Sequence, residues 1–205
     1  MRVVAGLLLL VGYSLAQSVT PFSVIEVSRQ FNQTGTLKSE SRFFFAVNRE
    51  GSIVSVDLDP SAGGTRQILD AVHGREILIS PKSRSASMMP YQIPRQSPAA
   101  CEQRFVIGFR DAAISVEKSA GIIQGVAVER VSVDWPDGSG MDVYMAPSLG
   151  CHMLRTISRR NGHALETEVA QNLRVGDPDG DLFEIPAGYR LTNVTLTWGR
   201  RPQTP

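Results

Sequence analysis

Apolar and polar residues alternate in short runs along most of this chain, and residues that favour turns separate the runs. A period of two is typical of strands that bury one face, whereas a helix needs a period near 3.6, which no long segment shows. The runs cover residues 22–30, 39–47, 52–59, 66–72, 75–80, 84–89, 114–118, 122–135, 141–146, 151–159, 163–175 and 191–198. The pattern predicts a mainly β fold, an antiparallel sheet with few and short helices.

Two-residue turn signals join some of these runs into hairpins. His73-Gly74 and Asn161-Gly162 each lie between two alternating runs. Asn-Gly is the stronger signal, because both residues readily take the positive φ of a tight turn. Residues 122–135 are predicted as one long strand, or a strand with a bulge near Gly125, since a glycine within a strand often marks a bulge.

Three consecutive aromatic residues, Phe43, Phe44 and Phe45, lie in one predicted strand. Successive side chains of a strand point to opposite faces. Either both faces of the sheet are covered here, or one of them is partly apolar. Near the other end of the chain, residues 182–189 include apolar side chains that are expected to pack against the sheet. A short helical turn capped by Asp179 is predicted at residues 179–183.

The first residues have the pattern of a signal peptide. A positive start at Met1-Arg2 precedes the apolar residues 3–11, which are too short to span a bilayer, and Ser14 and Ala16 provide the small residues of a cleavage site. We expect cleavage after Ala16 and export to the periplasm or the extracellular space. A buried first strand or a membrane anchor are the alternatives.

Composition supports one exported globular domain over residues 17–205, with residues 1–16 as the signal peptide. The formal net charge is +1, and loss of Arg2 leaves 20 basic against 20 acidic residues (21 − 1 = 20). No concentration of basic residues suggests nucleic-acid binding. Pro90, Pro94 and Pro98 predict a long surface loop over residues 90–100, with a linker between two domains as the alternative.

Cys101 and Cys151 are the only two cysteines. In an exported protein a lone pair is most often a disulfide, and a loop of this length makes such a bond stabilising by roughly 4 kcal/mol in the chain-entropy model. Two buried thiols or a redox pair are the alternatives, although no Cys-x-x-Cys motif is present.

Residues that could perform catalysis are scattered. Asp134, Asp137 and Asp142 lie close together in the sequence, but solvated hairpin ends are the favoured interpretation. There is no Gly-x-Ser-x-Gly elbow and no phosphate-binding glycine loop before a helix. We therefore predict no catalytic and no cofactor-binding residues, and no cofactor.

No metal site is predicted either. Asp177, Asp179 and Asp181 alternate as in a calcium loop, but the EF-hand positions six and twelve would fall on Leu182 and Gly188, so the match fails. His73, His152 and His163 lack the close spacing of a compact zinc site. A polar turn with a helix cap is the simpler interpretation of the aspartates.

Apolar side chains are more suggestive than polar ones. Phe43–Phe45, Met88-Met89 and the alternation of Met141, Val143 and Met145 offer adaptable surfaces. They are either ordinary core or the lining of a concave sheet that accepts an acyl chain or another apolar ligand.

The C-terminal run Gly176-Asp-Pro-Asp-Gly-Asp-Leu-Phe-Glu-Ile-Pro-Ala-Gly-Tyr189 resembles the end of a group of uncharacterised exported bacterial proteins that close on Asp-Pro-x-Leu-Phe-x-x-Pro-x-Gly-Tyr, here with Asp-Gly inserted. The similarity covers roughly residues 114–189. More distantly, the order of strands resembles the periplasmic lipoprotein-carrier and lipoprotein-receptor fold. That resemblance implies a single curved, half-barrel-like sheet whose concave side holds apolar chains, although long covering helices are missing from this sequence.

Three functions follow as hypotheses. The first is a non-enzymatic envelope protein that binds an apolar ligand or a lipidated partner in the concave face of its sheet. The second is a protein-interaction module that uses a sheet edge or the loop at 90–100. The third is a hydrolase with a site assembled from scattered residues such as Asp134, Asp142 and His152. The sequence does not indicate the ligand, the partner or the oligomeric state.

Overall fold

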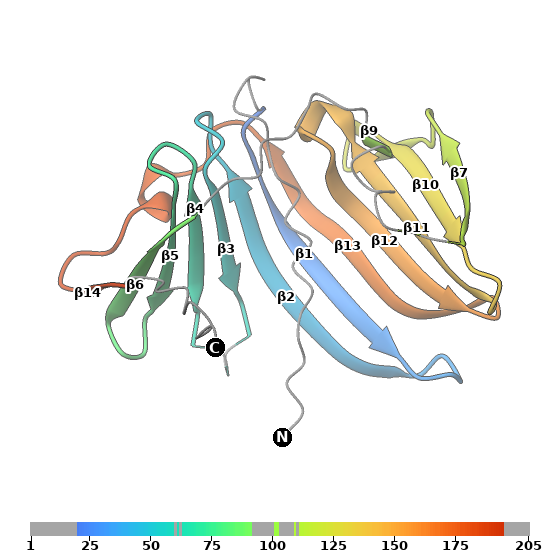
Figure 1. Cartoon of the computed structure of the whole chain (residues 1–205), viewed down its shortest axis with the longest axis horizontal. Coiled ribbons are helices and arrows are strands. Elements are labelled where there is room, and N and C mark those ends of the chain that lie inside the picture. The colour runs from blue at the N-terminus through green and yellow to red at the C-terminus, as the bar shows by residue number, and fades with distance from the viewer. Residues whose placement is uncertain are drawn as a thin grey trace, which may run out of the picture.

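Strands make up most of the described chain (Figure 1). The computed structural model describes residues 20–59, 61, 63–91, 101–102, 109 and 111–194 of the 205. The strands are β1 (Phe22–Phe31), β2 (Leu37–Val47), β3 (Ile53–Asp57), β4 (Arg66–Asp70), β5 (Arg75–Ser80), β6 (Ser85–Pro90), β7 (Ala113–Glu117), β8 (Ile122–Ile123), β9 (Val126–Ala127), β10 (Glu129–Asp134), β11 (Ser139–Ala146), β12 (His152–Arg160), β13 (His163–Val175) and β14 (Arg190–Asn193). Short 3-10 helices are η2 (Pro147–Leu149) and η3 (Gly180–Phe183). The predicted mainly β fold is confirmed.

Twelve strands form one sheet in the order β14-β6-β5-β4-β3-β2-β1-β13-β12-β11-β10-β7, and β8 and β9 form a separate hairpin. Neighbours in the large sheet are antiparallel except β14 and β6, which are parallel. The sheet curves without closing, because β14 and β7 lie at opposite edges (Figure 1). This confirms the curved, half-barrel-like sheet. At its centre β1 pairs with both β2 and β13, so Phe22 is opposite Val175 although most of the chain separates them.

Tight turns explain one correct prediction and one error. Asn161 and Gly162 have φ of 50° and 78° and join β12 to β13, as their sequence predicts. The single strand predicted over 122–135 is wrong, because Gln124 and Gly125 also have positive φ, 50° and 80°. Two consecutive residues of this kind reverse the chain, so the segment forms the β8–β9 hairpin and then β10.

Cross-strand partners point to the same side, so the register divides the sheet into two faces. We call one the Phe45 face, because Phe45 shares it with its partner Val24 and with Phe22. The other is the Phe44 face, which carries Phe44 with its partner Val56 and Ala46 with its partner Val54. Each strand contributes alternate residues to the two faces.

On the Phe45 face, the centre of the sheet carries a buried apolar cluster. Its buried members are Phe22, Val24, Val47, Val128, Ala146, Leu149, Leu154 and Ala170. Ile123 and Val126 of the β8–β9 hairpin pack against it, while their neighbour Ile122 is 74% exposed on the outer side of the hairpin. The hairpin is therefore a small cover over the middle of this face.

On the Phe44 face, a second cluster lies over strands β2–β6. Its buried members are Ala46, Val54, Ile68, Ile77, Ile79 and Ala86. Leu182, Phe183, Ile185 and Tyr189 of the C-terminal segment pack on it, which confirms the packing expected from the sequence. Phe44 packs here and Phe45 packs against the central cluster, so each face is covered at one residue of the aromatic run, whereas Phe43 belongs to neither cluster.

Polar contacts hold the C-terminal segment in place. The Asp179 side chain accepts a hydrogen bond from the backbone N–H of Asp181 at 3.1 Å and caps η3, as predicted. Nη1 of Arg66 donates to the carbonyl oxygen of Leu182 at 3.1 Å. The segment then continues into β14, which ends at Asn193 and is shorter in the described residues than the strand predicted over 191–198.

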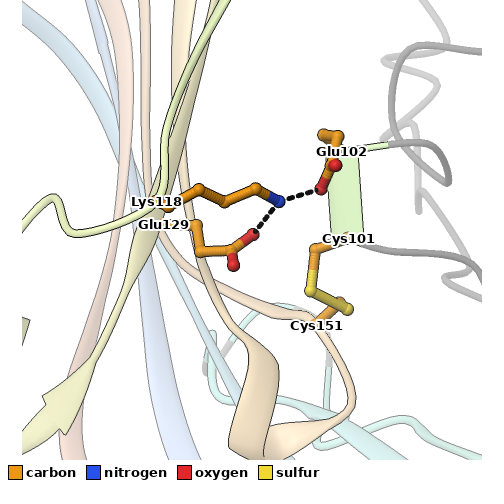
Figure 2. The surroundings of a disulfide bond; sticks show 5 residues. All are labelled: Cys101, Glu102, Lys118, Glu129 and Cys151. Carbon is orange, nitrogen blue, oxygen red and sulfur yellow. Dashed lines mark hydrogen bonds and ion pairs between the residues drawn. A yellow bond between two sulfur atoms is a disulfide. The ribbon is translucent and has the colours of Figure 1, made fainter.

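A third cluster lies on the Phe45 face beside β10 and β11 and includes the predicted disulfide, which is present between Cys101 and Cys151 (Figure 2). Val143 and Met145 are buried in this cluster and Met141 packs against it, so these residues are core. Figure 2 shows Nζ of Lys118 between two carboxylates, 2.6 Å from Oε2 of Glu102 and 3.3 Å from Oε2 of Glu129. The disulfide and this ion pair connect the short segment at Cys101 to the sheet.

Two predicted features lie outside the described residues: the signal peptide at 1–16 and residues 92–100 of the proline-rich loop. Pro90 is described and is the last residue of β6, opposite Arg75. Within the residues described, no helix has both the length and the apolar character needed to cross a membrane.

Candidate ligand-binding face

The Phe45 face of strands β2–β6 arranges its side chains in rows that run across the strands. One row consists of Val47, Ile53, Leu69, Glu76 and Met89. The adjacent row consists of Phe45, Ser55, Gln67, Leu78 and Ser87. Beyond these, Phe43 pairs with Asp57. The face therefore grades from mostly apolar at one end of the strands to mostly polar further along them.

Three large apolar side chains on this face remain partly exposed: Phe43, Leu78 and Met89. In the described structure they belong to none of the three apolar clusters. Partly accessible apolar side chains beside a few fixed polar groups are the usual lining of a ligand site. Here the fixed polar groups include Gln67, whose Nε2 donates to Oε1 of Glu76 at 2.7 Å.

Tyr91 follows β6 and extends this lining. Its backbone N–H donates to the carbonyl of Gly74 at 2.8 Å, which continues the β5–β6 pairing by one residue. Burial, together with the nearby charge of Glu76, raises the pKa of the Tyr91 hydroxyl, so it stays protonated and can donate a hydrogen bond at neutral pH.

His152 lies where this lining meets the centre of the sheet. Its ring stacks on Phe45 with centroids 4.7 Å apart and lies 4.8 Å from the ring of Phe22. The side chain is only 8% exposed, and its Nε2 is 3.1 Å from Oε1 of Glu26. The relative orientation of the imidazole and the carboxylate does not allow a hydrogen bond, so Nε2 of His152 is buried without a hydrogen-bond partner in the described structure. The electrostatic contact with Glu26 is close, but its direction is poor.

Glu26, which approaches His152, is followed on the same face by two further acidic side chains. Glu26 on β1 is opposite Ala170, and Glu168 and Glu166 on β13 are opposite Ser28 and Gln30. Burial, followed by the charges of Glu26 and Glu166, raises the pKa of Glu168 to about 7. A carboxyl group in this environment exchanges its proton near neutral pH.

The residues proposed for a hydrolase are not brought together. Asp134 and Asp142 both bind Arg159, at 2.7 Å and 2.5 Å, on the Phe44 face. Ser132 also donates to Asp142, at 2.6 Å. His152 lies on the Phe45 face, so the two aspartates form a structural ion-pair network with Arg159 and do not share a site with His152.

The aspartates and histidines weighed as metal ligands are also dispersed. Asp177 pairs with Arg49 at 2.6 Å, and Asp179 caps η3. Nδ1 of His73 is 2.8 Å from Asp70, far from the environment of His152. Across the described ranges, no three His, Cys, Asp or Glu side chains lie close enough together to hold a metal ion.

Sequence reasoning missed the acidic group on the Phe45 face. Glu166 and Glu168 are two residues apart in one predicted strand, so their common face could have been recognised. Their proximity to Glu26 could not, because it depends on the pairing of β1 with β13.

Comparison with known proteins identifies the fold and no family. No protein-family model and no curated protein matches the chain. An uncharacterised conserved protein from Thermus thermophilus is similar in structure, with a TM-score of 0.51 and 10% identity over 85% of this chain and 91% of that one. MucB in its complex with MucA(peri) has a TM-score of 0.50 and 14% identity over 85% of this chain and 57% of that one.

A LolA superfamily protein, NE2245 from Nitrosomonas europaea, is also matched, at 9% identity over 83% of this chain and 92% of that one; its TM-score of 0.36 is too low to support an inference. At these identities the likeness concerns the fold alone. The expected C-terminal motif group stays a prediction. The chain shares its fold with the Thermus thermophilus protein and with part of MucB.

Proposed function

We propose that this protein is an exported, non-enzymatic binding protein that holds an apolar chain against the Phe45 face of strands β2–β6. The observation that carries the proposal is the partial exposure of Phe43, Leu78 and Met89 on one face of a curved sheet. An acyl chain that covered these side chains would remove apolar surface from water, which stabilises binding by roughly 25 cal/mol per Å².

The two faces differ in a way that supports this assignment. On the Phe44 face of the same strands, the C-terminal segment already covers the apolar side chains. On the Phe45 face, Phe43, Leu78 and Met89 have no comparable partner within the described residues. A ligand bound there would cover these side chains, as the C-terminal segment covers those on the opposite face.

Export is part of the proposal. A disulfide persists in oxidising compartments, and Cys101–Cys151 is such a bond. The apolar segment at residues 3–11 and the small residues before Gln17 supply the export signal.

A fluorescence titration tests the binding function. Wild-type protein and the variants Phe43→Ser and Met89→Ser are titrated with a fluorescent fatty acid, and Val72→Ser is the matched control, because Val72 is 63% exposed in the β4–β5 turn. We expect saturable binding by the wild type and the control, weakened by about three- to tenfold in the two variants. Absence of saturable binding by the wild type would exclude the proposal.

A second candidate function, docking of a protein partner, is favoured by strand β7. It lies at one edge of the sheet, where its neighbour in the sheet is β10, and Ile114 and Val116 are each 40% exposed. An edge strand can pair with an extended peptide. The similar structure of MucB contains a bound partner, MucA(peri). If β7 is the docking edge, Val116→Lys abolishes co-purification of a partner that Val72→Lys retains.

A further inference from the structure

We propose that the ligand is an amphipathic cation, an apolar chain carrying an amine, whose ammonium group binds between Glu26 and Glu168 on the Phe45 face. The inference rests on the proposed binding function and names the chemical class of its ligand. It is carried by the arrangement of carboxylates, aromatic rings and His152 at the centre of the sheet.

The two carboxylates are close enough to share one cation. Glu168 is opposite Ser28 on β1, and Glu26 is two residues from Ser28 on the same face. Such diagonal neighbours are about 7–8 Å apart at Cα, within reach of long side chains. Ser28 itself donates to Glu166 at 3.3 Å, so the third carboxylate already has a partner.

The charge of these carboxylates is not compensated by the neighbouring strands. The arginines of β1, β2 and β13 are Arg29, Arg42 and Arg174, and the register places all three on the Phe44 face. Within the described residues, Glu168 has no hydrogen bond or ion pair, and the imidazole of His152 is the basic group that approaches Glu26. A partly buried carboxylate without a counter-ion is costly, so an added cation would be stabilising here.

His152 provides an independent indication of a polar ligand. Its Nε2 is buried, faces Glu26 and makes no hydrogen bond in the described structure. In the neutral imidazole an unprotonated Nε2 can accept a hydrogen bond, and an ammonium group has three N–H donors. The rings of Phe22 and Phe45 beside His152 can also stabilise a cation.

The apolar part of such a ligand would lie along the rows of the Phe45 face that begin beside this site. Glu26 is the direct cross-strand partner of Phe43, and Val24, the adjacent residue of β1 on this face, is the partner of Phe45. From there the rows of the Phe45 face lead to Leu78 and Met89. A metal ion fits less well, because no group of three suitable ligands forms within the described part of the chain.

The test compares three ligands with the same ten-carbon chain: decylamine, decanol and decanoate. Isothermal titration calorimetry at about pH 8, where Glu168 is ionised, measures each affinity below the micelle concentration. We expect decylamine to bind at least about tenfold more tightly than decanol, as one charge-assisted hydrogen-bonded pair provides, and decanoate to bind most weakly.

Charge-removing variants test whether the preference for decylamine over decanol depends on Glu26 and Glu168. Glu26→Gln and Glu168→Gln keep the shape of the side chain and remove its charge, so each should reduce the preference for the amine to below about threefold and leave decanol binding unchanged. Glu50→Gln is the control, because Glu50 is exposed in the β2–β3 turn, and it should keep the full preference. Circular dichroism verifies that each variant is folded.

The pH dependence gives a second measurement. At about pH 5.5 Glu168 is protonated, whereas decylamine remains charged, so the preference should fall relative to pH 8. Glu26 and Glu166 are the charged groups that act on Glu168, and His152 approaches Glu26, so the Glu168→Gln variant isolates the share of Glu168.

The outcomes separate this inference from the function on which it rests. Equal affinities for decylamine and decanol, or a preference that survives in Glu26→Gln and Glu168→Gln, would overturn the cationic ligand while leaving apolar binding intact. If none of the three compounds binds, both proposals fail.

Discussion

Single residues on the Phe45 face determine the chemistry of the proposed binding site. Phe45, Phe22 and His152 form an aromatic group, Glu26 lies against its histidine, and Glu168 interacts with Glu26. The sequence indicates that Glu166 and Glu168 share a face. It does not indicate that Glu26 lies on the same face beside them, because that proximity depends on the pairing of β1 with β13, which are far apart in the sequence.

Glu168 makes the stability of the fold depend on pH. Its pKa is raised to about 7 in the folded chain, from about 4.5 for an unperturbed side chain, so the folded state binds the proton more tightly than the unfolded state. This contribution is fully present below about pH 4.5 and is lost as the pH rises through about 7. Its magnitude is on the order of 1–2 kcal/mol once partial solvent screening is allowed for.

The variant Glu168→Gln should therefore be more stable than the wild type at about pH 8 and nearly equal to it at about pH 4.5. Urea denaturation at the two pH values measures both differences. Glu50→Gln should follow the wild type throughout, and a Glu168→Gln curve parallel to that of the wild type would show that Glu168 does not have a raised pKa.

At the scale of elements, alternation and turn residues predict most of the strands, and tertiary contacts decide the rest. The hairpin at Asn161-Gly162 follows from local preference. The hairpin at Gln124-Gly125 does not, because Gln124 gives no turn signal. The β8–β9 backbone pairing and the packing of Ile123 and Val126 on the central cluster stabilise the reversal. The C-terminal segment covers the Phe44 face over β2–β6, and the β8–β9 hairpin covers the Phe45 face at the centre of the sheet. No local sequence pattern predicts which face is covered in each part, because that depends on where these two segments pack.

The C-terminal segment is predicted to be a structural cover. Phe183 is partly buried against the cluster on the Phe44 face. Phe183→Ala should lower the free energy of unfolding by about 2–3 kcal/mol, somewhat less than for a fully buried phenylalanine. Leu191→Ala, in the exposed strand β14, should change it by less than about 0.5 kcal/mol. Equal effects in urea denaturation would contradict the packing described.

At the scale of the whole molecule, the disulfide connects Cys101, which follows the proline-rich segment, to the loop between β11 and β12. Replacing both cysteines by serine should lower the free energy of unfolding by about 2–4 kcal/mol. Denaturation of the double variant and of the wild type, with and without a reductant, measures the difference. Reductant should affect the wild type and leave the double variant unchanged; a response of both, or of neither, would be inconsistent with a stabilising disulfide.

Export predicts a defined mature chain. If the signal peptide is cut after Ala16, protein recovered from the exported fraction begins at Gln17. Intact-mass measurement of that fraction identifies the first residue. Full-length protein in that fraction would instead support an uncleaved anchor, and Ala16→Arg should block cleavage if the prediction is correct.

Two adjacent methionines provide the most direct test of where the ligand binds. Met89 lies on the Phe45 face, and Met88 packs on the Phe44 face against the cluster beneath the C-terminal segment. We propose to follow their methyl signals by NMR while decanol is added to saturation. Binding on the Phe45 face should shift the Met89 methyl signal and leave that of Met88 in place, whereas a shift of Met88 alone, or of neither, would contradict it.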